Sequence, residues 1–315
     1  MSQEAVAFIF PGQGSQFVGM GRELATFPEA QRMFAQADEV LGFSLSRLCF
    51  DGPEAELNDT INTQPAIVTH EVAALRVLEA RSDLREQLAL VAGHSLGEFS
   101  ALVCAGSLSF PDALRLVRER GRLMKLAGEQ HPGAMAAILG LDRAAVEAVC
   151  SEAAQAAEQP VQVANDNCPG QIVISGDKVA LDKAIELAKT LRGKVRPLAV
   201  SIAAHSPLMT GAAHEFRTAL ESAQWAEPRV PVIANATARP AGRRSVIDLL
   251  VAQLTSPVRW TESVQFMVGQ GVTHFVEVGP KDVLCGLIRR IDPAVTAHAV
   301  GKPDDLAFAQ ATISV

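Results

Sequence analysis

The chain has 315 residues, of which 48% are hydrophobic, and it carries a formal net charge of −7. This length and composition predict a globular protein with room for one large unit and a smaller one. The negative charge argues against general nucleic-acid binding, which depends on a basic surface. No basic, apolar leader and no long apolar run occurs, so we expect a cytoplasmic protein without membrane association.

Cysteine usage limits the possibilities further. The five cysteines are widely spaced and form no CxxC pair. This pattern predicts buried, reduced thiols rather than a disulfide framework or a zinc site.

The first third of the chain alternates strand and helix patterns. The apolar run AVAFIF at 5–10 predicts a buried strand, and the loop PGQGSQ that follows places Gln13 at the edge of a sheet. A second apolar run, 88–92, predicts another strand. Helical patterns cover 20–41, 64–80, 98–105 and 111–127. Such alternation is typical of a parallel α/β sheet.

The pattern changes between 130 and 202. Strand, helix, strand, strand, helix and strand are predicted at 134–139, 143–155, 161–164, 172–175, 179–191 and 195–202. The order βαββαβ is that of ferredoxin-like domains. We therefore predict an α/β protein in which a large unit, 1–129 and 203–315, carries a ferredoxin-like insert at 130–202.

The α/β pattern resumes after the insert. Ser206 and Pro207 predict an N-cap and a first-turn proline for a helix that runs to 222. Strands follow at 230–234 and 274–278, and helices at 246–254 and 262–270. The tail beyond 302 is expected to be loosely attached.

The stretch Gly93-His94-Ser95-Leu96-Gly97 matches G-x-S-x-G and lies between a predicted strand and a predicted helix. In such a nucleophile elbow the glycines allow close packing, and the serine adopts a strained conformation with an exposed hydroxyl. Ser95 is therefore the candidate nucleophile. The backbone N–H of Leu96 would lie at a helix N-terminus, where it can stabilise an oxyanion.

A serine nucleophile needs a base, and histidine has a suitable pKa. Among seven histidines, His205 lies where the apolar segment 198–204 gives way to a predicted helix, a strand end typical of catalytic groups. Strand alternation turns the His94 side chain away from that of Ser95, which favours a packing role. Structural or solvated roles are favoured for the other five: His70, His131, His214, His274 and His298.

Two further features fit such a site but leave alternatives open. The PGQGSQ loop can supply a second oxyanion N–H, or it can be a flexible phosphate-type loop, although it matches neither a P-loop nor G-x-G-x-x-G. Arg120 can bind a substrate carboxylate through two hydrogen bonds. It is one of four arginines on the predicted helix, which also fit a solvated face, and spacing alone does not single it out.

Seven motifs occur in an order that resembles a known family. They are FPGQGSQ at 10–16, GHSLGEFSAL at 93–102, ERGRLM around Arg120, NDNCPGQIVISG from Asn165, AAHSPLM around His205, QLTSPVRW from Gln253 and FVEVGP from Phe275. In this order the motifs resemble the malonyl-CoA:acyl-carrier-protein transacylases, from near the N-terminus to about residue 290.

The resemblance implies a hydrolase-like parallel-sheet domain with a ferredoxin-like insert, which agrees with the division above. It also implies that Ser95 takes the acyl group, that His205 is its base and that Arg120 binds the malonyl carboxylate. The backbone amides of Gln13 and Leu96 would form the oxyanion hole.

Further site residues follow from the same resemblance. A main-chain carbonyl near Gln253 would orient the histidine in place of an acidic residue, and Asn165 and Gln253 would contribute to substrate binding. Malonyl-selective members usually carry a bulky aromatic just before the histidine, where this chain has Ala203-Ala204. A small Ala204 would leave room for an α-substituted malonyl group.

The function expected is a ping-pong transfer of malonyl from malonyl-CoA, through Ser95, to an acyl carrier protein of fatty acid or polyketide synthesis. No metal or redox cofactor is expected, and the chain is expected to act as a monomer. The alternatives are a trans-acting polyketide acyltransferase that accepts other acyl-CoAs, a serine thioesterase or esterase, and an inactive carrier-docking subunit. A basic cluster at the end of the insert is either a carrier docking site or a solvated helix end: Lys189, Arg192, Lys194 and Arg196.

Overall fold

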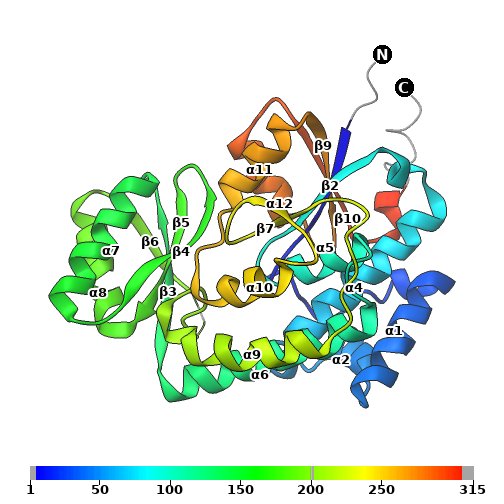
Figure 1. Cartoon of the computed structure of the whole chain (residues 1–315), viewed down its shortest axis with the longest axis horizontal. Helices are drawn as coiled ribbons and strands as arrows, with labels where there is room; N and C mark the ends of the chain where they lie inside the picture. The colour runs from blue at the N-terminus through cyan, green and yellow to red at the C-terminus, as the bar shows by residue number, and fades with distance from the viewer. Residues whose placement is uncertain (1–4, 199, 201, 307–315) are drawn as a thin grey trace.

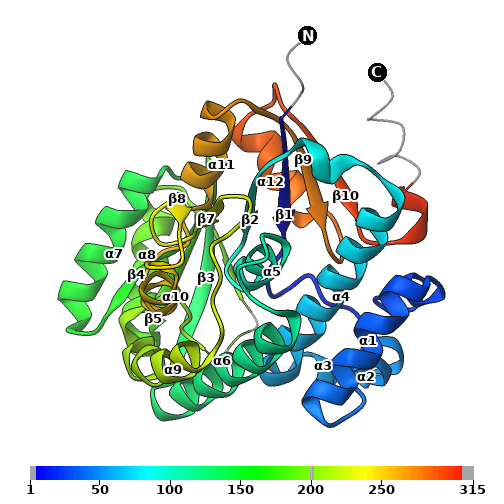
Figure 2. The same cartoon turned by 45° about the vertical axis from the view of Figure 1, so that its right-hand side comes forward.

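The computed structural model describes residues 5–306 except positions 199 and 201. A six-stranded sheet in the order β10-β9-β1-β2-β7-β8 forms the centre of the large unit (Figure 1). Its strands are β1 (Ala5–Phe10), β2 (Leu88–Gly93), β7 (Val232–Ala234), β8 (Arg239–Ala241), β9 (Val272–Val278) and β10 (Thr296–Val300). All neighbouring pairs are parallel except β7 with β8, and Figure 2 shows β1 between β2 and β9.

Both faces of the sheet are covered, which explains why β1 is a continuous apolar run. Phe8 and Phe10 belong to one hydrophobic cluster, whereas Ala7 and Ile9 belong to a second one, because successive side chains of a strand point to opposite faces. The helices of this unit are α1 (Pro28–Leu41), α2 (Leu45–Asp51), α3 (Glu54–Leu57), α4 (Thr60–Arg81), α5 (Gly97–Cys104), α6 (Phe110–Gln130), α9 (Thr210–Ser222), α10 (Val246–Thr255), α11 (Trp260–Gly269) and α12 (Val283–Ile291).

The insert has the predicted order of elements. It comprises β3 (Gly133–Leu139), α7 (Arg143–Ala157), β4 (Val161–Cys168), β5 (Gln171–Asp177), α8 (Lys178–Thr190) and β6 (Lys194–Pro197). The sheet order is β4-β5-β3-β6 with antiparallel pairs, and both helices pack on one hydrophobic cluster. The side chains of Asp142 and Asp177 cap the two helices. These features confirm the predicted α/β fold class with a ferredoxin-like smaller sheet.

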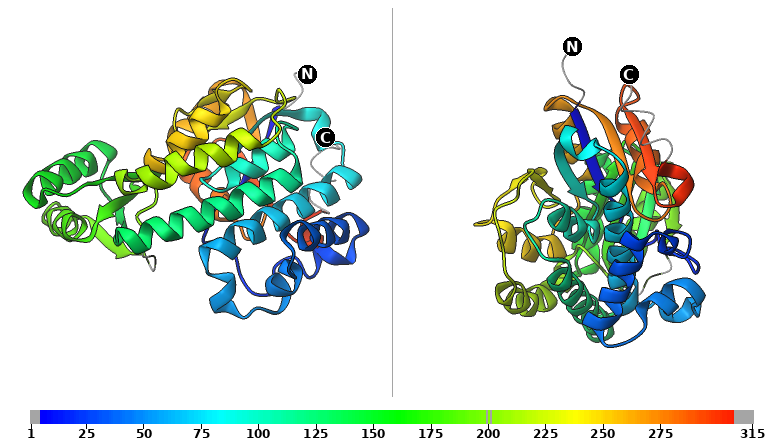
Figure 3. Two further views of the ribbon diagram at one scale, coloured as in Figure 1. Left: turned by 60° about the horizontal axis from the view of Figure 1, so that its bottom comes forward. Right: turned by 90° about the vertical axis from the view of Figure 1, so that its right-hand side faces the viewer.

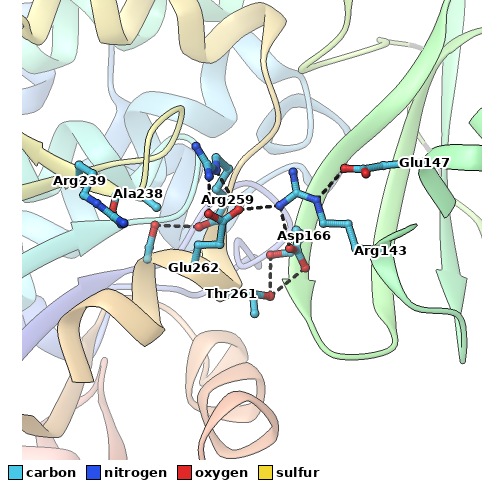
Figure 4. Close-up of polar contacts among 9 residues, drawn as sticks. Arg143, Glu147, Asp166, Ala238, Arg239, Arg259, Thr261 and Glu262 are labelled. Atoms are coloured by element: carbon cyan, nitrogen blue, oxygen red, sulfur yellow. Dashed lines mark hydrogen bonds and ion pairs between the residues drawn. The ribbon is translucent and has the colours of Figure 1, made fainter. Parts of the chain in front are cut away.

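Two long helices and a polar network join the insert to the large unit. Helices α6 and α9 lie side by side and run from one unit to the other (Figure 3). Arg143, at the start of α7, donates hydrogen bonds to Asp166 of β4 and to Glu262 of α11 (Figure 4). The Asp166 carboxylate also accepts from the Thr261 hydroxyl at 2.8 Å, and Glu262 pairs with Arg259. The insert is therefore held directly against the large unit.

Two predicted elements were wrong in extent. The helix expected over 20–41 begins at Pro28, because Gly19 and Gly21 adopt φ values of 104° and 81° that a right-handed helix does not accommodate. A short 3₁₀ turn, η1 (Leu24–Thr26), precedes it. The strand expected over 195–202 ends at Pro197.

The chain leaves the sheet after Leu198, whose N–H still donates to the Met135 carbonyl of β3 at 2.9 Å. The Val200 N–H donates to the carbonyl of Leu198 at 2.8 Å, so that N–H is not available to the ladder. Positions 199 and 201 of the predicted strand, and the tail from 307 onward, lie outside the described residues. Ser206 caps a 3₁₀ turn, η3 (Pro207–Met209), which precedes α9.

Candidate active site

Ser95 lies in a sharp turn between β2 and α5 and has a φ of 51°, a strained value for a residue with a side chain. A Cβ on Gly93 would lie 1.9 Å from the carbonyl carbon of Gly97, and a Cβ on Gly97 would lie 2.1 Å from the carbonyl oxygen of Phe10. Only glycine fits at either position. The two glycines of the motif therefore allow the close strand and helix packing that forces the serine into this conformation.

An asparagine holds the strained turn in place. The Ser95 N–H donates to Oδ1 of Asn235 at 2.6 Å, and Nδ2 of Asn235 donates to the Gly93 carbonyl at 2.6 Å. Asn235 follows β7, the strand next to β2. The sequence reasoning did not identify it. A buried polar residue directly after an apolar strand was the signal that could have found it.

His205 lies beside the serine with its tautomer fixed. Its Nδ1 is 2.7 Å from the main-chain carbonyl of Gln253, so Nδ1 carries the proton and donates it to that oxygen. Nε2 is 2.8 Å from Ser95 Oγ and can accept the serine proton. Burial and the nearby positive charge of Arg120 lower the pKa of His205 to about 3, which keeps the imidazole neutral and able to act as a base.

The backbone of His205 is also in a strained conformation. Its φ is 58°, and its carbonyl oxygen accepts a hydrogen bond of 2.7 Å from Nε2 of Gln162 on β4. The same amide nitrogen donates to the carbonyl of Thr255 at 2.9 Å. A side chain from the insert therefore fixes the loop that carries the base. His205 does not lie at a strand end as predicted, because the strand before it ends at Pro197.

Arg120 enters the site from α6 and is 2% exposed. Its Nη1 donates to Oε1 of Gln64 at 2.8 Å, and its Nη2 donates to Ser95 Oγ at 3.2 Å and to Oε1 of Gln253 at 3.0 Å. All three partners are neutral. Among the described residues Arg120 has no ion pair within 4.0 Å, and its buried Nε has no hydrogen-bond partner. Desolvation lowers its pKa to about 10, so the guanidinium is a buried cation with donor capacity to spare.

One pocket brings together most of the predicted site residues. Ser95, His205 and Arg120 line it, together with four other predicted residues, Gln13, Leu96, Asn165 and Ala204. Leu96 is the residue at the N-terminus of α5, as an oxyanion donor requires. Oε1 of Gln13 accepts from the Thr60 hydroxyl at 3.0 Å, which orders the PGQGSQ loop against α4.

Two predicted residues contribute from behind the pocket. Gln253 is 1% exposed, and its Nε2 donates to the Ser95 carbonyl at 2.9 Å. Ala203 is fully buried, and a Cβ on the neighbouring Gly133 would lie 2.5 Å from its Cβ. Ala203 therefore packs against the insert, whereas Ala204 lines the pocket.

His94, for which the sequence favours a packing role, is also among the residues that line the active-site pocket. Its Nε2 is 2.8 Å from Oδ1 of Asn167, and its ring lies 5.6 Å from that of Trp260. Within the part of the chain that the structure describes, no three His, Cys, Asp or Glu side chains are placed to hold a metal ion. None of the described helices is both long enough and apolar enough to cross a bilayer.

This geometry combines a serine nucleophile, a neutral histidine that can act as its base, and a buried guanidinium that can bind an anion. These groups together define an acyl-transfer enzyme for an anionic acyl group. The family model described as "Acyl transferase domain" matches residues 7–308. The chain is 45% identical over 306 residues to the malonyl CoA-acyl carrier protein transacylase of Escherichia coli K12, covering 96% of this chain and 98% of that protein. It is 44% identical to the Bacillus subtilis 168 protein of the same name, covering 98% and 97%.

Solved structures agree with the sequence relatives. The malonyl-CoA:acyl carrier protein transacylase of Xanthomonas oryzae pv. oryzae has a TM-score of 0.93 at 45% identity and 99% coverage of both chains. A malonyl-transacylase solved in complex with a type II PKS acyl-carrier protein has a TM-score of 0.94 at 43% identity, covering 98% of this chain and all of that one. The chain belongs to the acyl transferase domain family, and within it to the malonyl CoA-acyl carrier protein transacylases.

Proposed function

We propose that this chain transfers a malonyl group from malonyl-CoA, through an ester on Ser95, to the pantetheine thiol of an acyl carrier protein in fatty acid or polyketide synthesis. The observation that carries this proposal is the buried Arg120, whose Nη2 is 3.2 Å from Ser95 Oγ. A buried cation is costly unless it is paired. The free carboxylate of a malonyl thioester is a partner that would lie near the serine to which the acyl group is attached.

Acylation uses the hydrogen-bond chain from serine to histidine. Ser95 Oγ attacks the thioester carbonyl while its proton passes to Nε2 of His205, and the proton on Nδ1 stays bonded to the Gln253 carbonyl. The tetrahedral oxyanion would be stabilised by the backbone N–H groups of Leu96 and Gln13. When this intermediate collapses, the C–S bond breaks and His205 gives the proton to the sulfur of coenzyme A.

In the second half reaction the proton moves in the opposite direction, from a thiol through His205 to Ser95. The carrier's pantetheine thiol gives its proton to His205 as the sulfur attacks the malonyl ester, and His205 returns the proton to Ser95 Oγ as the ester bond breaks. Coenzyme A and the carrier thiol are chemically alike at the sulfur, so one base and one oxyanion hole serve both halves. Asn165 and Gln253 are proposed to position the acyl group and the arginine that binds it.

The alternatives use fewer of the observed features. A thioesterase or esterase would transfer the acyl group to water, and it has no use for a buried arginine next to its serine. An inactive carrier-docking subunit would not need the bonded pair Ser95 and His205. A polyketide acyltransferase for larger acyl groups is favoured by one observation, the small Ala204 in the pocket lining.

Intact-protein mass spectrometry after mixing with single acyl-CoAs tests the proposal. We expect a malonyl adduct on the wild-type protein, none on Ser95→Ala, and little adduct with acetyl-CoA. An acylated Ser95→Ala protein would exclude this nucleophile. Turnover to free malonate without transfer to a carrier would identify a thioesterase.

We propose a cytoplasmic location for the reaction. All five cysteines are free and buried. Unpaired cysteines of this number suit a reducing compartment, where thiols remain reduced.

A further inference from the structure

A buried carboxyl group lies directly behind the nucleophile. Glu98 is in the first turn of α5, three residues after Ser95, and is 1% exposed. Its Oε2 accepts the backbone N–H of Asn235 at 3.1 Å and Nε2 of Gln253 at 2.8 Å. These are the two residues that hold the N–H and the carbonyl of Ser95. Glu98 therefore positions both supports of the nucleophile turn.

The same carboxyl group is linked to the substrate-binding arginine. Gln253 donates to Glu98 through Nε2 and accepts from Nη2 of Arg120 through Oε1 at 3.0 Å. One neutral amide therefore separates the buried anion from the buried cation. Against the larger effect of burial, the charge of Arg120 lowers the pKa of Glu98.

Few other charges face Glu98. The strands against α5, namely β1, β2 and β7, contribute no titratable residue. From α4, Glu71 accepts a hydrogen bond from the hydroxyl of Ser100, two residues after Glu98 in α5, and burial raises the pKa of Glu71 well above its usual value. His94 and His205 have pKa values lowered by burial, and Arg120 is the cation contributed by α6.

We propose that Glu98 is the counter-charge of Arg120 in the free enzyme and that it takes up one proton from solvent when the malonyl carboxylate binds to Arg120. The proposal rests on the function proposed above and adds a residue whose protonation accompanies the binding of an anionic acyl group.

The reason is the balance of charge in a buried site. The malonyl carboxylate brings a second anion to a single cation, and two anions near one cation repel each other strongly where solvent is excluded. Protonation of Glu98 removes the repulsion. Its Oε2 can still accept from Asn235 and Gln253, while Oε1 carries the proton. Burial already raises the pKa of Glu98 to about 7, so the protonated form is accessible near neutral pH.

The chemistry of acylation does not consume or release a proton, because the serine proton leaves on coenzyme A. Any net uptake during malonyl loading therefore reports on a group outside the reacting atoms. Acetyl-CoA brings no carboxylate to Arg120, so acetyl loading should proceed without uptake.

The test is stopped-flow mixing with malonyl-CoA or acetyl-CoA in weak buffer containing a pH indicator, at a pH above the Glu98 pKa. Proton uptake is normalised to the Ser95 adduct measured by mass spectrometry. The wild type should take up close to one proton per malonyl adduct and none per acetyl adduct. Glu98→Gln should show no proton uptake on malonyl loading. The matched control is Glu71→Gln, which removes another buried carboxyl that is hydrogen-bonded to the same helix, and this variant should take up protons like the wild type.

A second readout separates this role from a structural one. In the wild type, kcat/KM for malonyl-CoA should fall about tenfold per pH unit above the Glu98 pKa, and in Glu98→Gln it should stay flat over that range. A full malonyl adduct on the wild type without proton uptake would overturn the inference and leave the proposed function intact. The absence of any malonyl adduct on the wild type would overturn both the inference about Glu98 and the proposed function. Because this measurement uses the wild type, it tests the inference even if Glu98→Gln does not fold.

Discussion

His205 is oriented by the Gln253 carbonyl rather than by a carboxylate. A carbonyl fixes the tautomer but adds no negative charge, so backbone hydrogen bonds offset only part of the effect of burial and of Arg120 on the pKa of this imidazole. Its pKa falls to about 3, below the usual value near 6.5. As a result the free enzyme keeps its base ready throughout the neutral range.

This shift predicts how stability depends on pH. Between pH 6.5 and 3 the unfolded chain binds a proton at His205 and the folded protein does not, so stability present above 6.5 is lost as the pH falls through this window. The slope due to this one group should approach about 1.4 kcal/mol per pH unit. Urea unfolding at several pH values should show a shallower loss for His205→Gln than for the wild type. Identical slopes would mean that His205 is not neutral when folded.

Ala204 should decide the size of the acyl group. It lines the pocket beside Ser95 and His205, so Ala204→Phe would fill the space next to the α-carbon of the bound acyl group. Because one extra methyl in a tight pocket is worth roughly tenfold or more, loading with methylmalonyl-CoA should fall at least about tenfold relative to malonyl-CoA. Competition between the two thioesters, read as adduct mass, measures this ratio. An unchanged ratio would place the α-carbon elsewhere.

At the level of elements, the turn between β2 and α5 is the most constrained part of the site. Gly93→Ala would place a Cβ 1.9 Å from the Gly97 carbonyl carbon, so strand and helix would have to separate. We expect a loss of about 3 kcal/mol in the free energy of unfolding and a much slower acylation. Gly211→Ala, in α9 with open space around its Cβ, is the matched control and should change stability by less than about 1 kcal/mol. Equal effects would show that the turn tolerates a side chain.

We propose that the end of the insert is a docking surface for the carrier next to the pocket. Lys189, Arg192, Lys194 and Arg196 are all exposed at the end of α8 and along β6. The chain then continues to Leu198 and Val200, which line the active-site pocket. An acidic carrier bound at this cluster would lie close to the entrance, which favours docking over a purely solvated helix end.

Charge reversal tests this surface. Arg192→Glu with Lys194→Glu should raise the KM for the carrier several-fold and weaken its dependence on salt, while the KM for malonyl-CoA stays the same. The control is Arg32→Glu with Arg47→Glu, an equal charge change on exposed positions of α1 and α2. If both double variants behave alike, the carrier docks elsewhere.

Elements with a local signal could be predicted, and those set by tertiary contacts could not. The apolar run of β1 predicts a buried strand, and the glycines around Ser95 predict a tight turn, in both cases from neighbouring residues alone. Helix α12 was not predicted because it has no N-cap signal in the local sequence. Its first N–H groups, those of Leu284 and Cys285, donate instead to the carboxylate of Glu277 on β9. The end of β6 was missed because apolar residues continue into the loop, where they line the pocket instead of a sheet.

The site residues divide in the same way. Ser95 follows from its motif, whereas Arg120 came from the resemblance because its helix carries four arginines. Asn235, Gln64, Gln162 and Glu98 were not identified, since their partners come from distant parts of the sequence. Which buried polar groups form hydrogen bonds with one another is decided only in the folded chain, so the sequence alone does not identify these residues.

On the scale of the whole molecule, the active site needs both units. Ser95 and Arg120 come from the large unit, and Gln162 of the insert holds the backbone of His205. We propose the boundaries 1–129 with 203–315 for the large unit and 130–202 for the insert. The polar network around Arg143 fixes the two against each other (Figure 4), so the insert serves as a wall of the site as well as a candidate docking surface.

Selectivity for the malonyl group depends on Arg120, and the acylation kinetics of Arg120→Ala test this most directly. Two charge-assisted hydrogen bonds to a carboxylate contribute roughly 1.5 to 3 kcal/mol each. The substitution should therefore lower kcat/KM for malonyl-CoA by at least about a hundredfold. Acetyl-CoA transfer should stay the same or improve, because an acetyl group has no carboxylate to pair with Arg120 and in the wild type only covers its guanidinium. Equal losses for malonyl-CoA and acetyl-CoA in a protein that remains folded would contradict the account.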